Sequence, residues 1–511
     1  MIRHFVSAAA LLAALCSDGR LLAGPRTEII PETTAARHGL TRPWFTQVQM
    51  DRGMGRVRYV VLHEGTLYVQ TDRAMVHAID AETGETYWAR QLGRPDHPSL
   101  APGASRDLLA VVNGSRLYVC NRFNGDLLYE VQVKGAPGAG PAVSEKRAYI
   151  PMVNGMVMAY RLDPLTDPMH ELGKIKKNLT EEEKLQLEED RRENIRIRQE
   201  YIPPMSCQSI GRAMVQPLVT RQNQGEEYCV WPTDRGYLNI GRIDRRSEDR
   251  LAIKWRLETD AGIAAQPTYL PGDPKKPGDS GIIFAASRDG FVHAIQENGG
   301  ESLWRFSTGE PILQPAVVIG QRVYVATQPG GMYCIDAKTG QELWWAPRVM
   351  QFVAASKQRV YVTDRLERIL VLHAETGGRL DTIPAAGSNI KLINSDTDRI
   401  YLGTETGLIQ CLHEMELTEP LVHDASLLAA RDEAPPTEQK GLDELQDQPQ
   451  PPAAQQPAAG EDIFGGDDAG ENPFDEPAGG DAAGEDPFGG AGGGGDDAGA
   501  DPFGDGENPF E

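Results

Sequence analysis

The sequence predicts an all-β fold, an eight-bladed β-propeller of four-stranded blades closed by an N-terminal strand. Three observations carry this prediction. A motif with a turn glycine and a following aromatic residue recurs along the chain, strand-like runs precede each copy, and the spacing between copies is close to the length of one propeller blade. The propeller is expected over residues 44–415, with a helical insertion at about 164–203.

The recurring motif places an aromatic residue four positions after a turn glycine. Thr-Gly or Asn-Gly closes a tight hairpin because glycine accepts a positive φ. The aromatic residue then falls on the next strand, where a large flat side chain can fill the gap between neighbouring blades. The residues that we expect to dock the blades on one another are Gly84, Gly125, Gly300 and Gly340 with Trp88, Tyr129, Trp304 and Trp344. A fifth copy, 371–377, carries Asp381 in the aromatic position, where we expect an empty place or another side chain.

Strand-like runs and prolines define the length of one unit. Runs of β-branched and aromatic residues precede each motif, and the units follow one another at 37–42 residues wherever no insertion intervenes. The eight units are visible at Leu67, Leu109, Ala148, Tyr228, Ile282, Val323, Val360 and Ile400. A proline is tolerated at the first residue of a strand, and five prolines mark such starts: Pro98, Pro141, Pro217, Pro267 and Pro315. Each unit therefore has four strands.

The two ends of the propeller region are expected to pair. The last unit ends near His413 without a clear fourth strand. The segment 44–49 has strand composition and precedes the first unit. Pairing these two segments closes the ring and removes open sheet edges, which would otherwise invite aggregation.

The motif that runs from Ala78 through Asp80, Thr83 and Gly84 to Trp88 resembles the tryptophan-docking motif of the pyrroloquinoline-quinone-repeat propellers, the quinoprotein alcohol dehydrogenase-like superfamily. That superfamily consists of eight-bladed rings, and the resemblance covers residues 44–415. It includes quinone-dependent alcohol dehydrogenases and a cofactor-free, BamB-like branch of scaffolds. The BamB-like branch implies a non-catalytic binding scaffold of the cell envelope with a role in protein assembly. The alternative is a PQQ-dependent oxidoreductase that acts on alcohols or sugars.

The sequence gives little support to the catalytic alternative. The quinoprotein dehydrogenases resemble one another in a disulfide between adjacent cysteines, a calcium ion and a catalytic aspartate, and this chain has no adjacent cysteine pair. Asp80 and Asp336 occupy equivalent repeat positions, so a role in the turn explains both. His77 matches His293 in the repeat, which favours packing over a metal site. We therefore assign no catalytic, cofactor-binding or metal-binding residue and expect no cofactor.

Three glutamines precede strand-starting prolines and occupy equivalent positions: Gln216, Gln266 and Gln314. At the inner ends of strands they would ring one mouth of the central channel and bind a peptide or a sugar through their amides. In the alternative interpretation the amides satisfy backbone groups of the loops between blades. The cysteines inside strand-like runs are read as buried small hydrophobes, with a disulfide as the alternative.

Charge and composition divide the chain into a body and a tail. The net charge is −23, but residues 432–511 contain 22 acidic residues and one basic residue, so residues 1–431 are near neutral. A near-neutral body argues against nucleic acid as a partner. The tail, rich in Pro, Gly and Asp, cannot bury enough apolar surface to fold. Its repeated Pro-Phe motifs are interpreted either as weak multivalent anchors or as part of a solubilising tail.

The N-terminus has the pattern of an export signal. Residues 1–23 are expected to be a signal peptide, followed by a lead-in at 24–43. Lipidation of Cys16 is not expected, because Leu15 stands where lipoprotein signals carry a small residue. We expect an exported protein of the periplasm or cell envelope with protein partners, no transmembrane segment in the mature chain, and a monomeric state in isolation. Within the insertion, Thr180 and Glu183 form a capping box that opens a helix on the rim.

Overall fold

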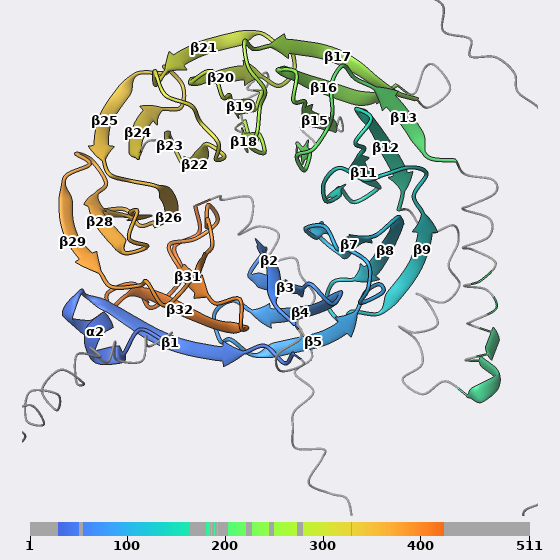
Figure 1. Cartoon of the computed structure of the whole chain (residues 1–511), viewed down its shortest axis with the longest axis horizontal. Coiled ribbons are helices and arrows are strands. Elements are labelled where there is room, and N and C mark those ends of the chain that lie inside the picture. The colour runs from blue at the N-terminus through green and yellow to red at the C-terminus, as the bar shows by residue number, and fades with distance from the viewer. Residues whose placement is uncertain are drawn as a thin grey trace, which may run out of the picture. The chain divides into compact units, whose positions relative to one another are not determined.

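The computed structural model confirms the eight-bladed propeller (Figure 1). It describes residues 29–50, 55–162, parts of 180–192, 203–220, 227–244, 250–272, 280–328 and 330–423. In this part of the chain the strands form eight four-stranded antiparallel sheets. The expected signal peptide, the tail at 432–511 and most of the insertion lie outside the described residues. Thr180 and Glu183 exchange the two capping-box hydrogen bonds at 2.8 and 3.3 Å.

The first four blades follow one another along the chain, and each runs from an inner to an outer strand. Blade 1 contains β2 (Val57–His63), β3 (Thr66–Thr71), β4 (Met75–Asp80) and β5 (Thr86–Gln91). Blade 2 contains β6 (Gly103–Ala104), β7 (Leu108–Asn113), β8 (Arg116–Asn121) and β9 (Leu127–Gln132). Blade 3 contains β10 (Ala142–Val143), β11 (Arg147–Pro151), β12 (Met156–Arg161) and β13 (Met205–Gln208). Blade 4 contains β14 (Leu218–Val219), β15 (Tyr228–Pro232), β16 (Tyr237–Asp244) and β17 (Arg250–Glu258).

The other four blades repeat this order. Blade 5 contains β18 (Thr268–Leu270), β19 (Ile282–Ala286), β20 (Phe291–Gln296) and β21 (Ser302–Ser307). Blade 6 contains β22 (Val317–Ile319), β23 (Arg322–Thr327), β24 (Gly331–Asp336) and β25 (Glu342–Pro347). Blade 7 contains β26 (Gln351–Ala355), β27 (Arg359–Thr363), β28 (Ile369–His373) and β29 (Arg379–Ile383). Blade 8 contains β30 (Ile390–Lys391), β31 (Ile400–Gly403), β32 (Leu408–Glu414) and the N-terminal strand β1 (Leu40–Gln47).

Blade 8 closes the ring as the sequence predicted. Strand β1 pairs antiparallel with β32, and Trp44 lies opposite Cys411. The strand begins at Leu40, four residues before the predicted start, because Leu40 already pairs with Glu414 at the end of β32. The short helix α2 (Glu32–Arg37) precedes it. Among the described residues, no helix is long and apolar enough to cross a membrane.

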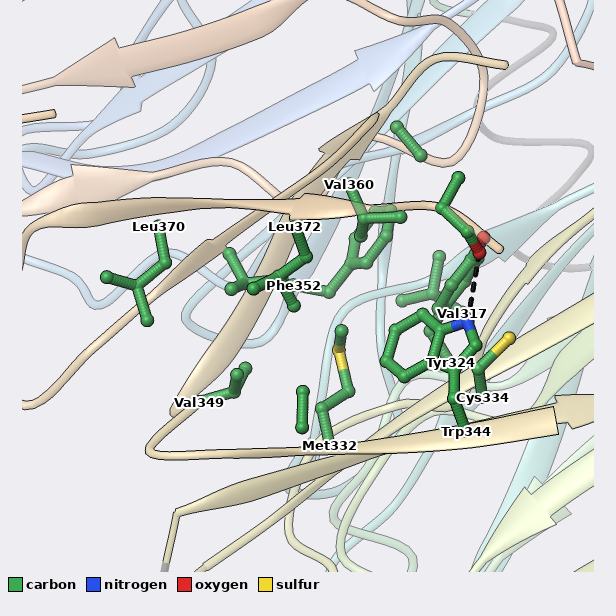
Figure 2. Close-up of a cluster of buried hydrophobic side chains, with 14 residues drawn as sticks. Val317, Tyr324, Met332, Cys334, Trp344, Val349, Phe352, Val360, Leu370 and Leu372 are labelled. Atoms are coloured by element: carbon green, nitrogen blue, oxygen red, sulfur yellow. Dashed lines mark hydrogen bonds between the residues drawn. The ribbon is translucent and has the colours of Figure 1, made fainter. Parts of the chain in front are cut away.

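The core is divided among the interfaces between consecutive blades, which we call junctions and number by their two blades. The buried residues of the described chain form eight apolar clusters, one for each junction. Figure 2 shows the cluster of junction 6/7, in which Trp344 and Tyr324 of blade 6 pack against Val360 of blade 7. Stability is therefore distributed around the ring, and each blade depends on both of its neighbours.

Candidate functional site: the blade junctions and the channel mouth

Junction 6/7 shows how one blade contacts the next. Trp344 of β25 lies against the turn of blade 7, and a methyl group added to Gly377 would come within 2.5 Å of the indole. The indole Nε1 donates a hydrogen bond to the carbonyl oxygen of Ala374 at 2.9 Å, drawn as a dashed line in Figure 2. The ring of Tyr324 lies 6.0 Å from the indole within blade 6. Only a glycine with φ of +68° leaves room for this contact.

The same contact recurs at the other predicted aromatic positions. Trp88 lies against Gly125 and donates to the carbonyl of Arg122 at 2.8 Å. Trp304 lies against Gly340 and is half-buried, whereas Trp88 and Trp344 are buried. Tyr129 is also buried.

Tyr129 reaches the next blade through its hydroxyl group, which donates to the carbonyl of Arg161 at 3.4 Å. Blade 3 has the long insertion at the place where blades 1, 2, 5, 6 and 7 carry the Thr-Gly or Asn-Gly turn. A tyrosine hydroxyl therefore makes the contact that an indole N–H makes elsewhere.

Two docking tryptophans were missed by the sequence analysis. Trp44 of β1 lies against Gly84 and donates to the carbonyl of Ala81 at 3.2 Å. Trp255 of β17 lies against Gly300. The glycine-to-aromatic spacing cannot find Trp44, because β32 and β1 come from opposite ends of the chain and no turn connects them.

Trp255 also lacks that spacing, because Leu251 stands four positions before it. A second signal was available in the sequence. Each docking tryptophan packs against an aromatic residue of the second strand in its own blade, with ring centroids 5.3–6.3 Å apart. The pairs are Tyr401–Trp44, Tyr68–Trp88, Tyr228–Trp255, Phe284–Trp304 and Tyr324–Trp344.

Asp381 lies in the aromatic position of blade 7, opposite Val371 of β28. Its carboxylate contacts Nδ1 of His38 at 2.6 Å. This hydrogen bond holds the pKa of the Asp381 carboxyl below its usual range. At junction 7/8, a side chain from the N-terminal segment therefore meets the residue that replaces the aromatic one.

The three predicted glutamines donate hydrogen bonds to other blades. The amide nitrogen of Gln216 donates to the carbonyl of Pro141 at 2.8 Å, and that of Gln266 donates to Pro217 at 3.1 Å. Gln314 donates to Met350 at 3.0 Å. A further glutamine, Gln351, was missed and donates to Lys391 at 2.9 Å. These amide nitrogens therefore connect the entrances of neighbouring blades.

Apolar side chains are exposed on the same loops as the glutamines. Ile210 and Met214 lie on the connection from blade 3 to blade 4, and Leu313 lies on the connection from blade 5 to blade 6. Each exposes between 38 and 51% of its surface. Methionine and leucine exposed on one face are typical of surfaces that contact another protein.

The repeat aspartates hold their own turns. Oδ1 of Asp80 accepts hydrogen bonds from the backbone N–H groups of Glu82 and Thr83, at 2.7 and 2.9 Å. Asp336 accepts the equivalent bonds from Lys338 and Thr339. The Thr339 N–H is the main cause that lowers the pKa of the Asp336 carboxyl. These carboxylates are engaged in Asx turns.

The sulfur and imidazole groups do not gather into a site. Cys120, Cys229, Cys334 and Cys411 are buried, each in a different junction cluster, and with the partly buried Cys207 they are free thiols. In the described residues, no three His, Cys, Asp or Glu side chains are arranged to hold a metal ion. The sequence has no adjacent cysteine pair of the kind that the quinoprotein dehydrogenases share.

Comparison with known proteins places this ring in a family. A family model described as "Outer membrane protein assembly factor BamB" matches residues 37–163 and 288–452, together more than half of the chain. The dehydrogenase subunit of a quinone-type alcohol dehydrogenase from Gluconacetobacter polyoxogenes is 24% identical over 148 residues, 27% of this chain and 19% of that protein. A quinohemoprotein alcohol dehydrogenase from Pseudomonas putida is 25% identical over 118 residues, 20% of this chain and 16% of that protein.

The curated relatives are much longer than the matched segment, which spans about a fifth of their length. Among solved structures, BamB from Moraxella catarrhalis matches 73% of this chain and 97% of its own, with a TM-score of 0.51 and 11% identity. At this identity the likeness shows the fold. On the family match and the eight-bladed ring together, the chain belongs to the PQQ-repeat β-propellers of the family described as outer membrane protein assembly factor BamB.

Proposed function

We propose that this protein is a non-catalytic scaffold that binds protein partners in the cell envelope. The observation that carries the proposal is the family match, which covers residues 37–163 and 288–452. In this proposal the predicted docking residues keep the blades together and take no part in chemistry; they are Gly84, Gly125, Gly300, Gly340, Trp88, Tyr129, Trp304 and Trp344. Their packing between blades supports this role.

The proposed binding face is the one that carries the connections between blades. Ile210, Met214 and Leu313 expose apolar surface there. In this proposal Gln216, Gln266 and Gln314, whose amide nitrogens donate to neighbouring blades, add polar groups around the channel mouth. An apolar patch with a rim of polar groups is the usual composition of a protein-binding surface.

Export belongs to the same proposal. The signal-peptide pattern at 1–23 would carry the chain to the periplasm or envelope. The test is fractionation of cells that produce the full chain, with antibody detection and N-terminal sequencing of the mature protein. Recovery of the uncleaved chain in the cytoplasm would contradict it.

The binding face can be tested by pull-down from envelope extract. Met214→Asp and Leu313→Asp should abolish capture of a protein partner, because a charge in a buried interface core is strongly unfavourable. Phe123→Asp is the matched control, because Phe123 is similarly exposed but lies on the β8–β9 turn, at the opposite end of the strands. A protein truncated before residue 432 shows whether the acidic tail takes part. Equal capture by all variants would refute the proposed face.

Quinone-dependent oxidation of alcohols or sugars is the second candidate, favoured by the two dehydrogenase relatives. The purified protein is mixed with pyrroloquinoline quinone and Ca²⁺, and bound quinone and dye reduction with alcohols or sugars are measured. Our proposal expects neither. Stoichiometric quinone binding with substrate-dependent dye reduction would replace it with the oxidoreductase.

A further inference from the structure

Junctions 3/4 and 7/8 both lack the two halves of the tryptophan–glycine contact. At junction 3/4, β13 has no aromatic residue and residues 245–249 of blade 4 contain no glycine. Asp381 lies opposite Val371 in blade 7, at the place where Trp344 lies opposite Cys334 in blade 6. The next blade has no turn between its third and fourth strands, because β32 and β1 belong to opposite ends of the chain. Blades 7 and 8 still share an apolar cluster, and the N-terminal segment contributes residues to it.

The segment 30–39, which we call the N-terminal latch, lies at this junction. Ile30 and Ala35 are buried in the apolar cluster that joins blades 7 and 8. His38 contacts Asp381 of blade 7 at 2.6 Å. The carbonyl of Gly39 accepts a hydrogen bond from the N–H of Met415, just after β32, at 3.0 Å. The latch thus contacts both blades, with apolar and polar groups.

The start of the latch is fixed on blade 8. The N–H of Ile30 donates to the side chain of Gln410 in β32 at 3.1 Å. Its carbonyl accepts a hydrogen bond from Arg42 of β1 at 2.7 Å. Arg42 also forms an ion pair with Glu32 of α2 at 3.3 Å. These contacts anchor the latch to blade 8, and His38 near its end contacts Asp381 of blade 7.

Polar groups complete the junction beside the latch. The hydroxyl of Tyr361 in blade 7 donates to Glu414 of blade 8 at 3.0 Å. Arg359 pairs with the same carboxylate at 3.4 Å, and its guanidinium lies next to Gly39. Charged and hydrogen-bonded groups therefore take the place of the indole at this junction.

We propose that residues 30–39 act as a latch whose release opens the ring at junction 7/8 while the other junctions stay packed. When junction 7/8 opens, blade 8 separates from blade 7 but stays packed on blade 1 through Trp44 and Gly84. A partner that binds the chain before Ile30, or a force applied to that part of the chain, would loosen junction 7/8 before any other junction. This inference does not depend on which partner the protein binds.

The test compares hydrogen exchange of the full-length protein and its latch variants. The double variant His38→Gln, Asp381→Asn should raise exchange in β28, β29, β31 and β32 about two- to fivefold, the change expected from a partly exposed ion pair. Ala35→Asp should raise it more than about tenfold, because it places a charge in an apolar cluster. Exchange in blades 2 and 5 should not change.

The buried thiols distinguish opening of one junction from unfolding of the whole ring. Cys120, Cys229, Cys334 and Cys411 belong to the clusters of junctions 1/2, 3/4, 6/7 and 8/1. They should stay unreactive to a thiol reagent in the latch variants while exchange at junction 7/8 rises. Thiols that become reactive in step with exchange would show global unfolding and overturn the proposal.

A matched control is available at junction 1/2, where Arg90 and Asp126 form an exposed inter-blade ion pair at 3.4 Å beside the Trp88–Gly125 contact. The double variant Arg90→Gln, Asp126→Asn should leave exchange at that junction unchanged. Wild-type exchange at junction 7/8 in both latch variants would overturn the proposal. An equal rise in hydrogen exchange at junction 1/2 in the control would also overturn it. Junction 1/2, with its Trp88–Gly125 contact, would then open as easily as junction 7/8.

Discussion

Blade 7 contacts its two neighbours by different means. Toward blade 6 it offers Gly377, on which Trp344 packs. Toward blade 8 it offers Asp381, which meets His38 of the N-terminal latch. The difference shows what a closed repeat requires: the docking pair needs a turn between the third and fourth strands, and the blade built from both chain ends has none. Residues outside the repeat must supply the contact there.

The largest expected effect is the loss of an indole at junction 6/7. Trp344→Ala removes a buried side chain and its hydrogen bond to Ala374. We expect the free energy of unfolding to fall by about 3–5 kcal/mol in urea titrations, as for other large core deletions. The adjacent Trp345 is 49% exposed and is the matched control. Trp345→Ala should cost at most about 2 kcal/mol, because half of its surface is already in water. Equal costs would show that the indole does not dock the blades.

The second prediction concerns the glycine on which that indole packs. Gly377→Ala should cost about 2–4 kcal/mol, because the new methyl group meets Trp344 at 2.5 Å and the residue keeps φ of +68°. Gly378→Ala is the control, since that glycine has no positive φ and the nearest atom to an added methyl is the Thr376 hydroxyl at 3.3 Å. Thermal unfolding of both variants measures the difference. A neutral Gly377→Ala would mean that the turn can shift away from the indole.

Repetition explains why so much of the fold could be predicted. The turn glycines and aromatic residues recur because most blades pack on their neighbours in the same way, so one copy predicts the copies that keep its spacing. The ring closure was also predictable, because the last unit ends at His413 without a fourth strand while a strand-like segment remains near the N-terminus. Periodicity and composition carry this information without any knowledge of long-range contacts.

The features that could not be predicted are those that break the repeat. His38 and Asp381 are 343 positions apart, and neither residue lies in a motif that predicts their contact. Trp44 docks on Gly84 without a connecting turn, so its spacing gave no signal. The glutamine positions were found by equivalence, but the hydrogen-bond acceptors of their amides depend on how neighbouring blades approach. Such contacts depend on tertiary geometry.

A smaller effect is expected from hydroxyl groups on the two sides of blade 8. Burial raises the pKa of Tyr361, so its hydroxyl remains protonated and donates to the carboxylate of Glu414 at junction 7/8. Tyr401 donates to the neutral carbonyl of Ala81 at junction 8/1. Tyr361→Phe should cost about 1.5–3 kcal/mol and Tyr401→Phe about 0.5–1.5 kcal/mol in urea titrations, because hydrogen bonds to charged groups are stronger. The reverse order would show that Arg359 alone satisfies Glu414.

The smallest effect concerns pH at the C-terminal side of junction 7/8. The backbone N–H of His423 donates to the backbone carbonyl of Asp396 in blade 8 at 2.9 Å. Burial lowers the pKa of the His423 imidazole, while Asp398 and the carbonyls of Ala355 and Thr397 raise it by smaller amounts. The folded protein therefore binds this proton less readily than the unfolded chain. The contribution of neutral His423 to the free energy of unfolding is fully present above the pKa of about 6.5 in the unfolded chain. It is lost as the pH falls below that value.

Lowering the pH from 7.5 to 5.5 should reduce the free energy of unfolding, by at most about 1.4 kcal/mol per pH unit for each such histidine. Burial lowers the pKa of His77 and His293 in the same direction, so the wild-type slope contains three contributions of one sign. In His423→Gln, the free energy of unfolding should still fall with pH because of His77 and His293, but the share of the slope that comes from His423 should be lost. Urea midpoints at four pH values measure this. An unchanged slope in His423→Gln would show that the imidazole at junction 7/8 takes up its proton without opening the fold.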